Sequence, residues 1–219
     1  MSHDLDPTDG ATVLAPDPDA PRDDDDDRDG CELIDGEWVE KHPEEVPEDD
    51  DDRKGCELID GVWVEKGMSN IGAVVESNLN FALKLHARTN RLGFVFAESA
   101  RYQLFPDVSK RVRKPDLSFI RFGRLPDDVI PPRGRFQLAP DLAVEVISST
   151  DIAEEVETKL DEYLRAGVCL VWFVYLPTRN VWAYKPDGTA KVYRTADALP
   201  GGDVLPGFSV PVAELFEGV

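Results

Sequence analysis

The stretch Asp141-Leu-Ala-Val-Glu-Val-Ile-Ser148 carries the strongest structural signal in this chain, because it is a strand-forming run with a single glutamate inside it. A helical pattern follows over residues 152–166 and ends at Gly167. Residues 169–175 are then strongly apolar, as is typical of a strand that is buried on both faces. A strand, a helix and a second strand in this order indicate an α/β domain.

Further elements are expected on both sides of this unit. Apolar residues at helical spacing predict a helix over 69–90, which Ser69 or Asn70 can cap. The other expected elements are strands over 94–104 and 114–122, a hairpin of strands 181–184 and 190–193, and a short helix near 212–216. Together they predict one mixed central sheet flanked by helices.

An internal repeat precedes this domain. Cys31-Glu-Leu-Ile-Asp-Gly-Glu-Trp-Val-Glu-Lys41 recurs 25 residues later as Cys56-Glu-Leu-Ile-Asp-Gly-Val-Trp-Val-Glu-Lys66. Each copy predicts a β-hairpin, because apolar residues flank an Asp-Gly turn. The second copy runs directly into the domain and is expected to occupy the native hairpin position. The first copy is then redundant, and it is either unfolded or loosely paired on a sheet edge.

The negative charge of the chain is concentrated at its beginning. Residues 1–53 hold 22 Asp and Glu against 4 Lys and Arg, whereas residues 54–219 hold 22 against 20. We therefore expect a disordered acidic tail over 1–30, a duplicated hairpin with an acidic linker over 31–53, and a folded domain over 54–219. Within that domain, residues 101–135 carry nine basic and four acidic residues, which form either a phosphate-binding surface or an ordinary solvated loop.

Several classes of protein do not fit the sequence. Three cysteines without a Cys-x-x-Cys pair argue against a disulfide framework and a zinc site, and they favour a cytoplasmic location. The longest apolar run, 168–176, is about half the length of a membrane span. Two of the three histidines, His3 and His42, precede the domain, and no P-loop or Gly-x-Ser-x-Gly motif is present. Histidine-dependent hydrolases are therefore disfavoured.

Two acidic residues are candidates for a metal site. Glu145 lies within an apolar strand, where a carboxylate is costly unless it is paired or bound to a metal, although an outward-facing position on an edge strand is an alternative. Asp116 follows Pro115 at the start of another expected strand, where a turn residue is the alternative. Two carboxylates that converge from neighbouring strands are the minimum protein ligand set for Mg²⁺.

Lys159 is the third candidate, on the helix that follows the Glu145 strand. A lysine on a surface helix is usually solvated, and Glu155 lies four residues before it, within reach of an ion pair. In a nuclease, however, a lysine at this place would orient the attacking water or stabilise charge on the phosphate.

From Gly55 to Phe216 the chain resembles the Uma-two family of endonucleases, in the PD-(D/E)XK superfamily. The stretches that carry the resemblance are 56–66, 112–120, 139–148, 159–168 with Trp172, and 203–208. The resemblance implies a restriction-endonuclease-like core and a possible homodimer. It also implies that Asp116 is the PD aspartate and Glu145 the second acid. In the superfamily the lysine usually lies two positions after the second acid, where this chain has Ile147. The resemblance to the family implies that Lys159 supplies the lysine instead.

These assignments predict a metal-dependent endonuclease that uses Mg²⁺ or Mn²⁺ and acts on nucleic acid, most simply DNA. Asp116 and Glu145 hold the metal, the backbone carbonyl of Val146 adds a ligand, and Glu98 or Glu76 is a candidate to complete the shell. Two alternatives stay open at this point. One is a catalytically silent nucleic-acid-binding or regulatory domain with a nuclease fold, and the other is an interaction module that depends on the acidic tail.

Overall fold

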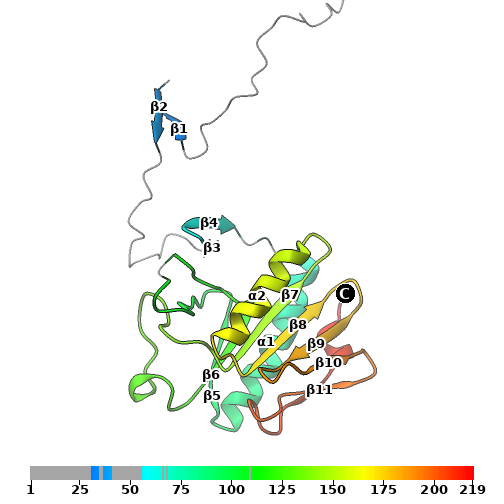
Figure 1. Ribbon diagram of the computed structural model, residues 1–219. Coiled ribbons are helices and arrows are strands. Elements are labelled where there is room, and N and C mark those ends of the chain that lie inside the picture. Colours follow the sequence, from blue (N-terminus) through cyan, green and yellow to red (C-terminus); the bar gives the residue numbers. More distant parts are fainter. Residues whose placement is uncertain (1–30, 35–36, 41–55, 66, 68, 109) are drawn as a thin grey trace, which may run out of the picture. The chain divides into compact units, whose positions relative to one another are not determined.

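The structure is a computed structural model that describes residues 31–34, 37–40, 56–65, 67, 69–108 and 110–219 (Figure 1). The chain divides into two compact units, Met1–Glu44 and Glu45–Val219. The predicted tail (1–30) and most of the predicted acidic linker lie outside the described residues. Within the described part, no helix is both long enough and apolar enough to cross a membrane.

A six-stranded mixed sheet forms the centre of the second unit, with the strand order β10-β9-β8-β7-β6-β5. The strands are β5 (Gly93–Ala97), β6 (Leu117–Arg121), β7 (Leu142–Ile147), β8 (Leu170–Tyr175), β9 (Asn180–Tyr184) and β10 (Ala190–Tyr193). Only the β7–β8 pair is parallel in this sheet. The expected strand–helix–strand unit is therefore the centre of the domain, and the prediction of an α/β fold with a mixed sheet is confirmed.

Helices cover both faces of the sheet (Figure 1). On one face lies α1 (Asn70–Thr89), which Ser69 caps by accepting a hydrogen bond from the Gly72 amide at 3.0 Å. On the other lies α2 (Ala153–Arg165), which connects β7 to β8. The short α3 (Val212–Leu215) contributes to the same apolar core as α1.

Strand alternation assigns each residue of β7 to one of the two faces. Leu142 and Val144 belong to the core beneath α1, whereas Ala143 and Ile147 belong to the core beneath α2. Glu145 has the same parity as Ala143 and Ile147, so its side chain lies on the α2 side. The acidic residue therefore faces the helix that carries Lys159.

The expected strand over 94–104 is shorter in the structure. β5 ends at Ala97, and a turn follows in which the Ala100 amide donates to the Ala97 carbonyl at 3.2 Å. Tyr102 then forms single bridges to Arg113 and Phe136 instead of continuing the strand. A two-stranded sheet of β11 (Ala198–Pro200) and β12 (Ser209–Pro211) was not predicted, because three-residue strands leave almost no periodicity.

Both copies of the repeat form antiparallel hairpins in equivalent register. The first comprises β1 (Cys31–Ile34) and β2 (Glu37–Glu40), and the second β3 (Cys56–Ile59) and β4 (Val62–Glu65). Cys31 is opposite Glu40 in the first hairpin, as Cys56 is opposite Glu65 in the second. The second hairpin contacts the domain directly, because Leu58 and Val112 exchange backbone hydrogen bonds of 3.2 and 2.9 Å.

Candidate active site

Asp116 and Glu145 lie next to each other at one end of the sheet. The antiparallel register pairs Leu117, the first residue of β6, with Val144 of β7. Asp116, which directly precedes β6, is therefore adjacent to Glu145, which follows Val144 in β7. Both side chains are 1% exposed. They line the same small cavity, of about 20 Å³, together with Val146 and the N-terminal turn of α1. The structure therefore brings the two predicted acids together in a buried position.

The backbone of Val146 faces Asp116. Its amide donates to Asp116 Oδ2 at 2.6 Å. Asp141 and Ile147 are an odd number of positions away from Val146, so their carbonyls point to the opposite edge of the strand. Both carbonyls accept hydrogen bonds on the β8 side, from the Leu170 and Leu176 amides. By strand alternation, the Val146 carbonyl points away from β8 and towards the Asp116 side. The carbonyl that was predicted as a metal ligand thus lies on the edge of β7 that faces Asp116.

Lys159 reaches this site from α2. Its Nζ atom lies 3.5 Å from Glu145 Oε2 and 3.4 Å from Glu57 Oε2, and its side chain is only 14% exposed. Lys159 is therefore not the solvated surface lysine that a position on a helix usually indicates. The structure brings all three predicted catalytic residues into one cluster.

Tyr163, one helical turn after Lys159, holds the other oxygen of Glu145. Its hydroxyl donates to Glu145 Oε1 at 2.6 Å, and its side chain is fully buried. Burial and the charge of Glu145 raise the pKa of Tyr163 well above its ordinary value, so the hydroxyl keeps its proton and remains a donor. Glu145 is thus oriented by two groups from the same face of α2.

A third acid, Glu57 of the β3–β4 hairpin, also belongs to this cluster and was not singled out from the sequence. Glu57 Oε2 lies 3.1 Å from Arg113 Nη1, and Glu57 Oε1 accepts a hydrogen bond from the Lys114 amide at 3.0 Å. Arg113 in turn donates through Nε to Glu162 at 2.5 Å. The only available sequence signal was the repeated Cys-Glu-Leu-Ile motif, which does not indicate a partner more than 50 residues away.

Arg113 is the cationic centre of this buried network. Its side chain is 4% exposed, and those of Glu57 and Glu162 are 7% and 8% exposed. Burial alone would lower the pKa of Arg113, but the hydrogen bond to Glu162 and the charges of both glutamates outweigh burial and raise the pKa above its ordinary value. Arg113 therefore stays charged and links the hairpin to α2.

The two further candidates for a metal shell do not line the small cavity. Glu98 Oε1 pairs with Lys114 Nζ at 2.9 Å, and Glu98 does not line the small cavity. Glu76 is half-buried on α1, one turn after Gly72, which does line it. Among the described residues, no cluster of three or more His, Cys, Asp or Glu side chains could hold a metal ion. Two carboxylates and a backbone carbonyl still suit Mg²⁺, which commonly retains waters and substrate oxygens in its shell.

The fold defines the chain as an α/β domain of the restriction-endonuclease-like class. A family model described as "Uma2: Putative restriction endonuclease" matches residues 39–213, and the chain belongs to this family. The resemblance to the Uma-two family is thereby confirmed.

The same fold is found among solved structures. One of them is the crystal structure of a protein from Anabaena variabilis, described as "a putative nuclease belonging to DUF820". The TM-score is 0.64 at 20% sequence identity, and the match covers 78% of this chain and 93% of that one. No curated protein matches this chain in sequence.

Proposed function

We propose that this chain is a metal-dependent endonuclease that hydrolyses phosphodiester bonds of DNA. The observation that carries the proposal is the convergence of Asp116, Glu145 and Lys159 at one end of the sheet: two buried acids line a single cavity and the lysine pairs with one of them. Membership of a family described as restriction endonucleases supports the same reaction class.

Asp116, Glu145 and the Val146 carbonyl are the groups that would hold Mg²⁺ or Mn²⁺. When bound, such an ion lowers the pKa of a coordinated water and neutralises charge on the phosphodiester. Lys159 has a separate task, because its ammonium group orients the attacking water or stabilises the negative charge that develops on the phosphate. Tyr163 keeps Glu145 in place through its 2.6 Å hydrogen bond.

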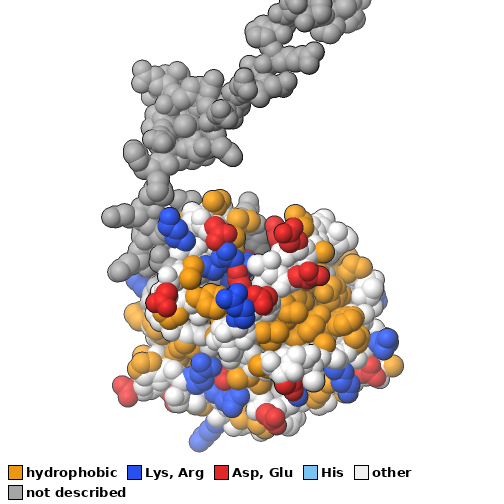
Figure 2. Space-filling model, in the orientation of Figure 1, with side chains coloured by type: hydrophobic (Ala, Val, Ile, Leu, Met, Phe, Trp, Pro, Cys, Tyr) orange, Lys and Arg blue, Asp and Glu red, His pale blue; other side chains and the backbone are white. Residues whose placement is uncertain are grey.

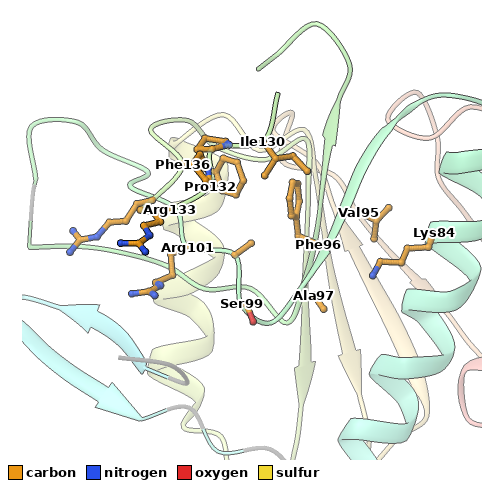
Figure 3. A pocket seen from close by; sticks show the side chains of 14 residues that line it. Lys84, Val95, Phe96, Ala97, Ser99, Arg101, Ile130, Pro132, Arg133 and Phe136 are labelled. Atoms are coloured by element: carbon orange, nitrogen blue, oxygen red, sulfur yellow. The ribbon is translucent and has the colours of Figure 1, made fainter. Parts of the chain in front are cut away.

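A cationic pocket beside the edge strand β5 is the proposed contact for the nucleic acid backbone (Figure 3). It has a volume of about 370 Å³, and its lining contains four basic side chains (Lys84, Arg101, Arg133 and Arg135) and no acidic one. In Figure 3, Lys84 reaches the pocket from α1, while Arg101 and Arg133 lie on the other side of β5. Because Ala97 lines the pocket and pairs with Leu117, the pocket reaches the end of the sheet that holds Asp116.

The reaction is tested by incubating the full chain with single- and double-stranded DNA and RNA in the presence of Mg²⁺ or Mn²⁺. We expect cleavage of DNA that stops when the metal is chelated. We also expect Lys159→Met to lower the cleavage rate at least about a hundredfold, because it removes the positive charge beside the proposed phosphate position. Equal rates for Lys159→Met and the wild type would exclude a catalytic role for this lysine.

The matched control for this variant is Lys185→Met, which removes an exposed lysine after β9, outside the cluster. It is expected to retain the wild-type rate. If the well-folded wild type cleaves none of the four substrates with either metal, the nuclease proposal is wrong and the domain is catalytically silent.

The proposed DNA contact is tested by binding without divalent metal at a series of salt concentrations. Each phosphate contact contributes about 0.9 to the slope of log K against log salt. We therefore expect Arg101→Ala and Arg133→Ala to weaken binding to all DNA sequences and to reduce that slope by about 0.9 each. Arg165→Ala, at an exposed arginine paired with Asp161, is the control and should leave the slope unchanged. An unchanged slope in both pocket variants would place the DNA elsewhere.

A further inference from the structure

The β3–β4 hairpin is held in a defined position, which we call the hairpin seat: the backbone of Lys110 and Val112 and the side chains of Arg111, Arg113 and Lys159. The backbone holds the hairpin through Leu58, as described above, and through the Gly61 amide, which donates to the Lys110 carbonyl at 3.2 Å. The side chains of the seat bind two hairpin acids. Arg111 pairs with Asp60, while Arg113 and Lys159 pair with Glu57.

The first copy of the repeat contains every one of these docking groups. Glu32, Leu33 and Asp35 correspond to Glu57, Leu58 and Asp60, and the Asp-Gly turn is also repeated. Over eleven residues the copies differ only where Glu37 replaces Val62. Val62 is 64% exposed, whereas Leu58 is fully buried. The single difference therefore falls at a position where a charged side chain remains in water, and the buried positions are unchanged.

The backbone of the first copy also matches. β1 and β2 pair in the same backbone register as β3 and β4. The first copy therefore has both the residues and the strand register with which the second copy binds the seat.

We propose that the first hairpin is an alternative occupant of the hairpin seat within the same chain. In that exchanged state Glu32 replaces Glu57 beside Lys159, and the second copy is released as part of a longer connection to α1. The proposal does not depend on the nuclease function, because it concerns only which of two equivalent hairpins is seated.

Connection lengths set the balance between the two states. The second copy is joined to α1 by three residues (67–69), and the first would be joined by 28 residues (42–69). The equilibrium constant for closing a flexible connection falls with the three-halves power of its length. It is therefore on the order of thirtyfold smaller for the longer connection than for the shorter one. The second copy therefore occupies the seat in the wild type, and the first is seated in about 3% of molecules.

Leu58→Asp in the full chain tests the exchange, because it places a charge at the buried position of the second copy only. The readout is hydrogen exchange at the Val112 amide, which donates to the hairpin at 2.9 Å. We expect protection to fall only about thirtyfold in Leu58→Asp, because the first copy takes the seat. In Leu33→Asp/Leu58→Asp neither copy fits, and protection should fall on the order of a thousandfold. Leu33→Asp alone should match the wild type.

A second variant addresses whether the first copy is competent for the seat. Deleting residues 42–66 joins the first copy directly to Gly67, which restores the short connection. We expect this chain to fold and to protect the Val112 amide as the wild type does. Failure of the deletion chain to protect it would overturn the proposal, as would equal losses of protection in Leu58→Asp and the double variant. Protection in Leu58→Asp that rises with protein concentration would also overturn it, because the occupant would then come from another molecule.

Discussion

We expect Asp116→Asn to lower the metal-dependent cleavage rate at least about a thousandfold, the largest effect on activity of any substitution considered for this chain. The change keeps the size of the side chain and a hydrogen-bond acceptor for the Val146 amide, which now donates to Asp116 Oδ2 at 2.6 Å. It removes the negative charge of one of the two proposed carboxylate ligands; Asp151 also lines the cavity, but its carboxylate accepts hydrogen bonds from the Ser148 amide and hydroxyl. With Glu145 as the only carboxylate among the proposed ligands, the site would no longer match the ligand set that holds Mg²⁺.

A readout other than activity separates this interpretation from simple misfolding. A metal that binds the folded chain stabilises it, by about 2.7 kcal/mol when its concentration is one hundred times the dissociation constant. We expect urea unfolding to show such a Mg²⁺- or Mn²⁺-dependent gain for the wild type and none for Asp116→Asn. A variant that is folded, shows the full gain and yet cleaves normally would contradict the assignment of Asp116.

Asp141→Asn is the matched control, because Asp141 is also a buried aspartate of the same sheet, 3% exposed, at the start of β7. Its carboxylate pairs with Arg121 and Arg124 at 3.2 and 3.1 Å and does not line the small cavity. Its substitution is expected to lower the free energy of unfolding by about 1–3 kcal/mol while the metal-dependent gain persists.

The largest effect on stability is expected for Arg113→Met, which should lower the free energy of unfolding by about 3–5 kcal/mol. Arg113 lies between Glu57 and Glu162, and all three side chains are at most 8% exposed. Methionine fills similar space but leaves two buried carboxylates without this cation. Glu57 would keep Lys159 and Glu162 would keep Arg111, but each would lose its most buried cationic partner. That loss is costly because the protein interior solvates carboxylates poorly.

A double-mutant cycle tests this explanation by equilibrium urea unfolding. Arg113→Met should cost less in a Glu162→Gln background, because one of the two carboxylates that lose this cation is then uncharged. Arg165→Met is the control: the Arg165–Asp161 pair is 69% and 63% exposed, and its loss should change stability by less than about 1 kcal/mol. Equal costs for Arg113→Met in both backgrounds would mean that the buried charges are not the cause.

The surface around α2 agrees with this division between buried and exposed charges. Figure 2 shows acidic and basic side chains interspersed on this face, with an apolar area beside them. Exposed pairs of this kind contribute little to stability because water and salt screen them. The charges that matter for the predicted loss of stability in Arg113→Met are those that the hairpin and α2 cover.

Much of the architecture follows from the sequence alone. The apolar periodicity of α1, the buried composition of β8 and the single glutamate of β7 each depend on residues close together in the chain. Strand alternation places Glu145 on the same face as Ala143 and Ile147, and its hydrogen bond from Tyr163, which packs in the same core as those two residues, agrees with this. The pairing of Asp116 with Glu145 was also predicted, from two strands expected to be neighbours.

Tertiary structure decided which groups surround those acids. Glu57 meets Arg113 and Lys159 only because the hairpin pairs with the backbone around Val112, and Glu98 is held by Lys114 instead of lying at the cavity. Tyr163 reaches Glu145 because α2 packs back over β7. Local periodicity assigns a side chain to a face, but it does not specify its partner on a distant segment. Such partners depend on strand register and helix packing, which form only when the whole domain folds.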